Sequence, residues 1–213
     1  MAKSRIINRP VSPALPQATV EYQRQYQDQL NNVLRIYFNQ LDNATNAITS
    51  DLAGGSLLYF PHGAFVSTTS QTMPTADSAR LISFPDTLAG TEIIGMSVVN
   101  GNRVLFEYAG AYQISVNLHV RSTSAADKDV TVWLRKNGVD IPNSARRETL
   151  RGVGSSIIEY TLSVELAALS YIEVVWAANN SNVELTATAA NAPYPAVPSA
   201  IVNIEQKSNV LLE

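Results

Sequence analysis

The sequence contains no cysteine and few charged side chains. The absence of Cys from all 213 residues excludes disulfides, thiolate zinc sites and thiol catalysis. Charged residues make up 15% of the chain and the net charge is −3, whereas an ordinary soluble domain is about 25% charged. Sequence-independent nucleic-acid binding requires an excess of basic surface, which this chain lacks. We therefore expect no nucleic-acid partner.

Long apolar runs are also missing. No stretch approaches the ~18 residues of a membrane-spanning helix, and residues 1–16 carry charges but no apolar segment typical of a secretory signal. We therefore expect no membrane partner and no secretion. In place of charge, Ser, Thr, Asn and Gln fill 61 positions, while 46% of residues are apolar, enough for one good core. The sequence predicts a soluble protein with a polar but weakly charged surface.

The first segment, residues 1–18, is a Pro-rich extended arm. Pro10, Pro13 and Pro16 are spaced by three, and proline favours extended, polyproline-like geometry both for itself and for the residue before it. Such an arm is either a disordered tail or a peptide that becomes ordered on a partner. We favour the second interpretation, an anchoring arm.

Residues 19–50 are predicted to form one long amphipathic helix, with Thr19 as its N-cap. No Pro or Gly interrupts this segment, and its apolar positions recur about every 3.67 residues, which keeps them on one face of a nearly straight helix. The stripe either packs on its own domain or pairs with other copies of the chain. We favour self-association, with an interface formed by Tyr22, Tyr26, Leu30, Leu34, Tyr37 and Leu41.

The rest of the chain is predicted to be β-structure. A loop-rich linker spans 51–79, an antiparallel jelly-roll β-sandwich spans 80–207, and 208–213 form a tail. Residues 112–121 alternate strictly between large apolar and polar side chains, as in a strand with one buried face, and Asn137-Gly138 is a strong tight-turn signal. The regular spacing of such short segments predicts a mainly β fold, a sandwich or jelly roll.

Several of these segments, in their order, resemble the tumour-necrosis-factor/complement-head jelly roll, in the version found in bacteriophage structural proteins. They are "GAYQISV" from Gly110, "WLRKNGVDIPNS" from Trp133 to Ser144, "YIEVVW" from Tyr171 to Trp176, and Pro198-Ser199 with Ile204. The family often has Gly-Asp where this chain has Leu169-Ser170, so that turn departs from the pattern. The stretch Leu30–Asn43 also resembles an N-terminal piece that recurs in phage virion proteins.

The resemblance implies a homotrimer with subunits packed around a threefold axis. Apolar side chains on both faces of the segment 171–178 are in keeping with a strand between a core and another subunit. Tyr171, Val175 and Trp176 are therefore candidate interface residues. The alternative is that this segment is a central core strand.

No pattern predicts an enzyme, a cofactor or a metal site. His62 and His119 are the only histidines, too few for a zinc site without thiols. Asp127, Asp129 and Asp140 could hold calcium, but their spacing matches no calcium loop, and solvated turn carboxylates are the simpler interpretation.

Arg146, Arg147 and Arg151 form the one basic cluster, after the Asn137-Gly138 turn. They are a candidate loop for a ligand or partner, although a solvated loop is the simpler interpretation. Together with the resemblance, these features predict a virion protein assembled in the host cytoplasm: a homotrimeric decoration, cement or short-fibre protein that binds other virion proteins of the capsid, tail or portal. The alternative is a tail-fibre or adaptor module that binds a receptor or a host-surface glycan.

Overall fold

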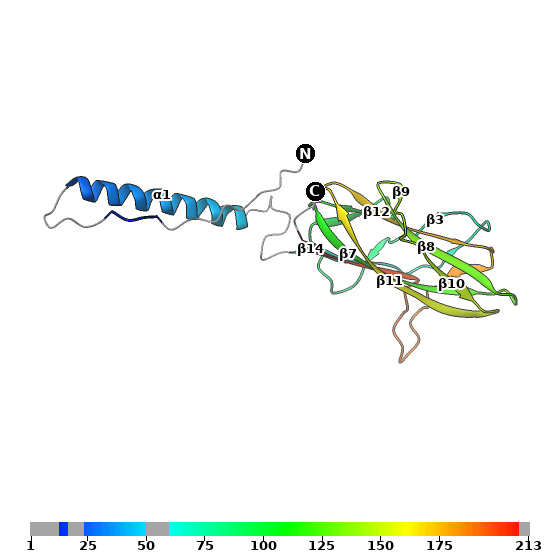
Figure 1. The fold of residues 1–213 in the computed structure, drawn as a ribbon. Helices are drawn as coiled ribbons and strands as arrows, with labels where there is room; N and C mark the ends of the chain where they lie inside the picture. Colours follow the sequence, from blue (N-terminus) through cyan, green and yellow to red (C-terminus); the bar gives the residue numbers. More distant parts are fainter. Residues whose placement is uncertain (1–12, 17–23, 50–59, 209–213) are drawn as a thin grey trace.

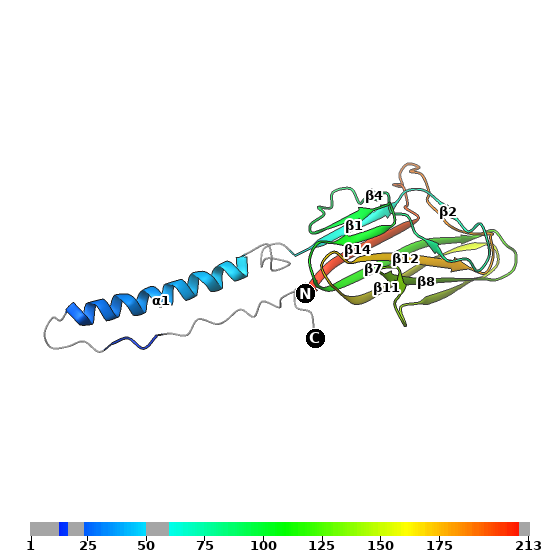
Figure 2. The ribbon, with the colours of Figure 1, turned by 90° about the horizontal axis from the view of Figure 1, so that it is seen from above.

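The computed structural model describes residues 13–16, 24–49 and 60–208, with helix side chains described as far as Ala44. Within these ranges it contains one helix, α1 (Arg24–Thr49), and fourteen strands in two antiparallel sheets (Figures 1 and 2). The predicted fold class, a mainly β chain with an N-terminal helix and an antiparallel β-sandwich, is confirmed. The strands are β1 (His62–Ser67), β2 (Gln71–Thr72), β3 (Arg80–Leu81), β4 (Asp86–Thr87), β5 (Met96–Val99), β6 (Arg103–Phe106), β7 (Gly110–Ser122), β8 (Lys128–Lys136), β9 (Val139–Asp140), β10 (Arg146–Leu150), β11 (Gly154–Leu166), β12 (Tyr171–Ala178), β13 (Val183–Leu185) and β14 (Ala200–Ser208).

The order of the strands is that of a jelly roll. The first sheet runs β11-β7-β14-β1-β4, with β13 and β2 continuing beside β7. The second runs β10-β8-β12-β6-β5, with β9 beside β8 and β3 beside β12. The chain thus crosses repeatedly between the sheets, as in two interlocked Greek keys.

The core lies between the two sheets. On β7 the five apolar side chains predicted to face inward are 0% exposed, and they are Tyr112, Ile114, Val116, Leu118 and Val120. The largest buried side chain, that of Trp176, comes from β12 in the opposite sheet. The rings of Phe106 and Tyr112 meet edge to face, with their centroids 4.6 Å apart. Each sheet therefore turns one face into a common core, as the alternation of residues 112–121 predicts.

The sandwich begins earlier than the sequence indicates. Strand β1 lies within the predicted linker 51–79, yet it pairs with β14 along its whole length, from His62–Glu205 to Ser67–Ala200. Five of its six residues are buried, so both of its faces are covered. A strand buried on both faces shows no alternation between apolar and polar residues, which is why the sequence did not reveal it.

Gly110, at the start of β7, allows the close approach of the end of β14. Its φ is +157°, and a Cβ atom there would overlap the Ser208 carbonyl oxygen and the Gln206 side-chain amide. We predict that Gly110→Ala lowers the free energy of unfolding by about 1–3 kcal/mol, as overpacking typically does, measured by urea denaturation.

The matched control is Gly154→Ala at the start of β11, where the nearest atom to a new Cβ is the Arg151 carbonyl oxygen at 3.7 Å. This control should stay within about 0.5 kcal/mol of the wild type. Equal stability of the two variants would contradict the assigned role of Gly110.

Candidate functional site

Helix α1 carries an apolar stripe that its own chain does not bury. The helix stripe consists of Tyr26, Leu30, Val33, Leu34, Tyr37, Leu41 and Ala44. All of these side chains are at least partly exposed, Leu41 at 39%, and none of the described side chains of α1 is buried. Both views show the helix apart from the sandwich (Figures 1 and 2). The predicted interface residue Tyr22 lies outside the described residues.

Local interactions give α1 little support. Its first turn has no acidic residue and its last turn no basic one, so its dipole is uncompensated. Arg24 and Asp28 form an exposed ion pair at 3.9 Å, a type that contributes at most about 0.5 kcal/mol. Most helical stability in proteins comes from packing of the apolar face. This helix therefore requires a surface to cover its stripe.

The described part of the arm, Pro13–Pro16, runs beside α1 in both views (Figures 1 and 2). Pro13 and Pro16 are half-buried, while Leu15 is 55% exposed. Pro10 lies outside the described residues.

Two of the three predicted interface residues on β12 face inward or are covered within the chain. Trp176 is 1% exposed in the core and Val175 is 0% exposed, although Val175 lies on the opposite side of the strand. Strand β12 is central in its sheet, with β8 on one edge and β6 and β3 on the other. The alternative interpretation, a central core strand, thus holds for Val175 and Trp176, which we remove from the interface. Tyr171 is half-buried at the outer face of this sheet.

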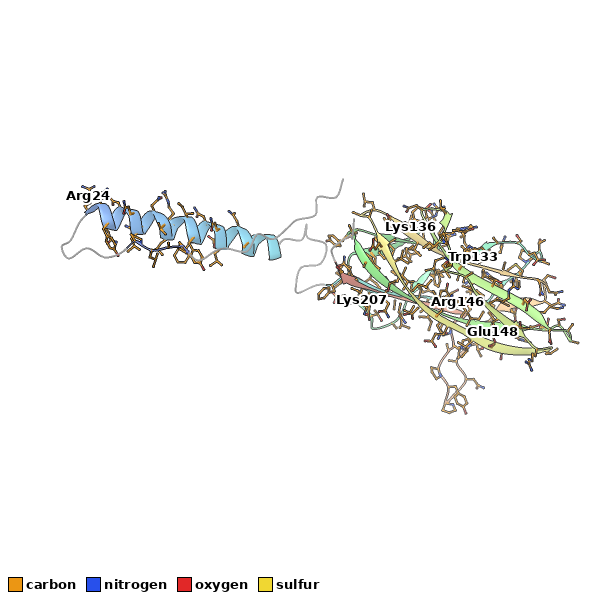
Figure 3. The ribbon with its side chains drawn as sticks, in the orientation of Figure 1. Arg24, Trp133, Lys136, Arg146, Glu148 and Lys207 are labelled. Carbon is orange, nitrogen blue, oxygen red and sulfur yellow. The ribbon has the colours of Figure 1, made fainter. Side chains whose placement is uncertain are left out.

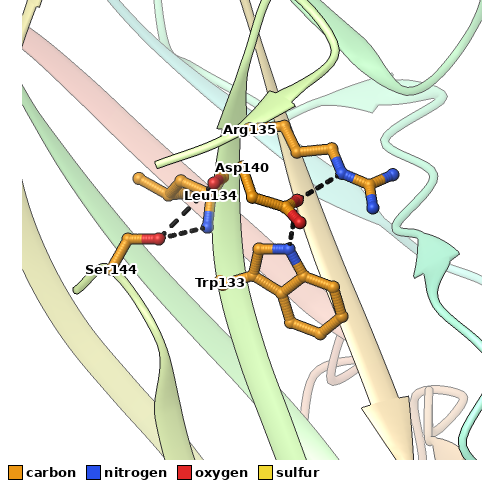
Figure 4. Close-up of polar contacts among 5 residues, drawn as sticks. All are labelled: Trp133, Leu134, Arg135, Asp140 and Ser144. Carbon is orange, nitrogen blue, oxygen red and sulfur yellow. Dashed lines mark hydrogen bonds and ion pairs between the residues drawn. The ribbon is translucent and has the colours of Figure 1, made fainter. Parts of the chain in front are cut away.

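The β8–β9 hairpin is built by the residues of the "WLRKNGVDIPNS" motif. Asn137 and Gly138 both have positive φ, +52° and +81°, as a tight two-residue hairpin turn requires. The buried Ser144 hydroxyl accepts the Leu134 N–H at 3.1 Å and donates to the Leu134 carbonyl oxygen at 3.4 Å (Figure 4). The Asn137 side-chain oxygen accepts the Tyr171 N–H at 2.9 Å. The motif thus fixes the hairpin against β12.

Four charged residues form a row across the outer face of the second sheet, and two of them lie on this hairpin. This charge ladder is Arg103 on β6, Glu173 on β12, Arg135 on β8 and Asp140 on β9. Arg135 pairs in register with both Glu173 and Asp140. Arg103 Nε donates to Glu173 Oε1 at 2.9 Å, and Arg135 Nε donates to Asp140 Oδ1. The ladder therefore joins four strands.

These contacts shift the pKa values of two ladder residues, Arg103 and Asp140. Glu173 is 3% exposed, so its charge requires a partner. The hydrogen bond with Glu173 raises the pKa of Arg103. The pKa of Asp140 is lowered by hydrogen bonds from Arg135 and from the Trp133 indole, whose Nε1 donates at 2.7 Å (Figure 4).

Two aromatic rings flank the ladder. The Arg103 guanidinium lies 4.8 Å from the centroid of the Tyr171 ring, and that of Arg135 lies 5.9 Å from the Trp133 ring. These distances are those of cation–π contacts. Trp, Tyr and Arg on one rigid sheet face are the residue types that dominate binding hot spots. Arg103 and Glu173 could not be predicted as a pair from the sequence, because 70 positions separate them and only the strand pairing brings them together.

The three arginines of the predicted cluster do not lie together in the structure. Arg147 lies on the same outer face as Trp133, with its Nε 3.4 Å from Thr131 Oγ1. Arg146 points to the other side of β10, over the Tyr160 ring at 5.9 Å, and Figure 3 shows it beside Glu148 on the same strand. Arg151 is exposed in the loop after β10. Only Arg147 therefore joins the face that carries the ladder.

The predicted calcium candidates are held separately. Asp127 accepts the Gly152 N–H at 3.1 Å, Asp129 accepts the Thr149 hydroxyl at 2.7 Å, and Asp140 belongs to the ladder. No group of three or more potential metal ligands forms among the described residues. His62 Nδ1 lies 2.7 Å from the Phe60 carbonyl oxygen, and His119 is half-buried on the outer side of β7.

No helix in the described part of the chain has both the length and the apolar character to span a membrane. No protein-family model matches the chain, and no curated protein matches it significantly.

We predict that the indole N–H resonance of Trp133 titrates with Asp140, with a midpoint below 3.8, the ordinary value for this carboxyl. Because the folded pKa lies below the unfolded one, the contact stabilises the fold above the unfolded pKa and is lost as the pH falls through the folded pKa. NMR of the two indole groups measures this, with buried Trp176 as the internal reference. A midpoint at or above 3.8, or one that persists in Asp140→Asn, would contradict the assigned contact.

Proposed function

We propose that this chain is a structural protein of a bacteriophage particle, a homotrimer anchored through its N-terminal arm and helix. The jelly roll would project from the particle as a decoration or cement knob or as a short fibre. The observation that carries the proposal is the helix stripe, which its own chain leaves at least partly exposed along its described length. The protein acts by assembly and stabilisation through buried surface, without chemistry of its own.

The energetics of α1 favour association with other copies. Burying one large apolar side chain contributes about 1.5–3 kcal/mol, and the stripe contains several. The uncharged residues Gln27 and Gln40 beside the stripe let neighbouring chains approach without desolvating ions. A stripe that follows a nearly straight helix suits packing of several parallel copies along a common axis.

The sandwich supports the same proposal. Its jelly-roll strand order is the one that the resemblance to phage structural proteins implies, and its motif residues build the β8–β9 hairpin. The outer row of β7 contains the uncharged polar residues Gln113, Ser115 and Asn117, and the Ser115 and Thr161 hydroxyls lie 2.8 Å apart. At the end of this row Arg121 pairs with Glu184 at 3.7 Å, and a subunit packed on this face must also pair the exposed Glu159, which lies opposite Asn117 on β11.

We predict that Leu30→Asp combined with Leu34→Asp reduces incorporation of the protein into particles at least tenfold, because two charges would enter an apolar interface. Immunoblots of purified particles measure incorporation. The matched control, Asn32→Asp with Asn39→Asp, adds the same charges to the opposite face of α1 and should leave incorporation unchanged.

Both variants should keep the circular dichroism of a folded sandwich, because no described side chain of α1 is buried. Deletion of residues 1–50 is the coarser test and should abolish incorporation of a folded sandwich. Normal incorporation of the Leu30/Leu34 variant or of the deletion would contradict the proposed anchor.

A second candidate function is recognition of a host receptor or surface glycan by the projecting domain. The face that carries Trp133, Tyr171 and Arg147 beside the charge ladder favours it, since aromatic and guanidinium groups there are exposed in part and held rigidly.

We predict under this alternative that the isolated protein binds host cells and that Trp133→Ala with Arg147→Ala removes the binding, measured by flow cytometry. Arg146→Ala is the matched control, because Arg146 lies over Tyr160 on the other side of β10. If the isolated protein does not bind host cells at any concentration, this alternative is wrong and only the proposed structural function remains.

A further inference from the structure

A hairpin between β13 and β14 projects from the sandwich and ends in an exposed tyrosine. This hairpin, residues 187–198, is called the finger, and both views show it leaving the body of the domain (Figures 1 and 2). Residues 188–196 are all exposed, and Tyr194 at the tip, between Pro193 and Pro195, is 72% exposed. No charged residue occurs between Glu184 and Glu205. An uncharged protrusion with an aromatic tip is typical of an interaction element.

The finger is held by backbone hydrogen bonds. Thr188 and Val197 exchange both of their bonds at 2.8 Å, and Asn191 and Tyr194 exchange theirs at 3.1 and 2.8 Å. At its base, the fully buried Ser199 hydroxyl donates to the Thr69 carbonyl oxygen at 2.6 Å. A tip fixed in this way loses little conformational entropy on binding, which favours affinity.

The sandwich also carries an apolar groove, which lies at one edge of the two sheets. This edge groove, of about 330 Å³, opens between β4 and β5, the last strands of their respective sheets. Its apolar lining comes from Phe65, Phe84, Ile93, Met96 and Val98, and Asp86 is the one charged residue among those that line it. Its volume is at the lower end of the range of about 300–1,000 Å³ for ligand pockets, so it suits a side chain better than a large ligand.

We propose that the finger of one copy inserts Tyr194 into the edge groove of the next copy. The tip is apolar and uncharged, as is most of the groove, and the Asp86 carboxylate is an acceptor for the phenol hydroxyl. When two different surfaces of identical chains bind each other, the chains form a closed ring if the rotation from one chain to the next divides a full turn. The contact would also cover one free edge of each sheet, at β4 and β5, which otherwise invites uncontrolled pairing. This inference rests on the proposed homotrimer and specifies how its jelly rolls join.

Cross-linking of engineered cysteines tests the contact, because the natural chain has no cysteine and gives no background. The full chain with Thr87→Cys at the groove and Ala196→Cys, an exposed position beside the tip of the finger that leaves Tyr194 in place, is treated with a short bis-maleimide. We expect covalent species of two and three chains. The matched control pairs Ala196→Cys with Val139→Cys, a 70% exposed position on β9 away from the groove, and should remain uncross-linked. Equal cross-linking of the two pairs would overturn the proposal.

A second measurement uses Tyr194→Ser, compared with Val153→Ser, which removes another apolar side chain that is 68% exposed. Sedimentation should show association weakened at least about tenfold by Tyr194→Ser alone, as for a hot-spot residue. A wild-type trimer that Tyr194→Ser leaves unchanged would overturn the finger contact while the homotrimer stands. A wild-type chain that stays monomeric would overturn both.

Discussion

The pairing of β7 on both of its edges is the interaction on which the sandwich depends. Strand β11 pairs with it along the whole of Gly110–Ser122, and β14 pairs with its other edge from Ala111 to Leu118. Its inward side chains are completely buried. Because neighbouring strands pair with both edges of β7 and the core covers its inner face, only its outer face is at the protein surface. The core of the sandwich is therefore complete within one chain, although the buried Tyr160 hydroxyl and Gln206 Oε1 have no hydrogen-bond partner among the described residues.

The helix and the finger differ from the sandwich in this respect. Helix α1 leaves its apolar stripe at least partly exposed, and the finger holds Tyr194 away from the core. Both elements are poor in charge, as is the chain as a whole. Exposed apolar surface without charge is unfavourable for a protein that remains alone, and it is what association of several copies would bury. The scarcity of charge in the whole chain is thus also found on the two surfaces that we propose contact other chains.

The parts of the fold that follow from local pattern could be predicted. The alternation of residues 112–121 predicted which side chains of β7 are buried, and Asn137-Gly138 predicted the β8–β9 turn. Strand β1 and the covered Val175 could not be predicted, because burial on both faces removes the period of two. The charge ladder depends on pairing between distant strands, and the finger follows β13, which ends at Leu185. Long-range pairing decides all of these features, and local pattern does not contain it.

The motif residues that carry the resemblance have structural tasks: Ser144 holds the Leu134 backbone, and Asn137 binds the backbone of Tyr171. They hold the fold together, whereas the function must come from the surfaces that remain free. The homotrimer is the claim on which the other proposals rest. Sedimentation equilibrium of the full chain tests it most directly: we predict the mass of three 23.1 kDa chains over a wide range of concentrations. A single-chain mass at every concentration would contradict it.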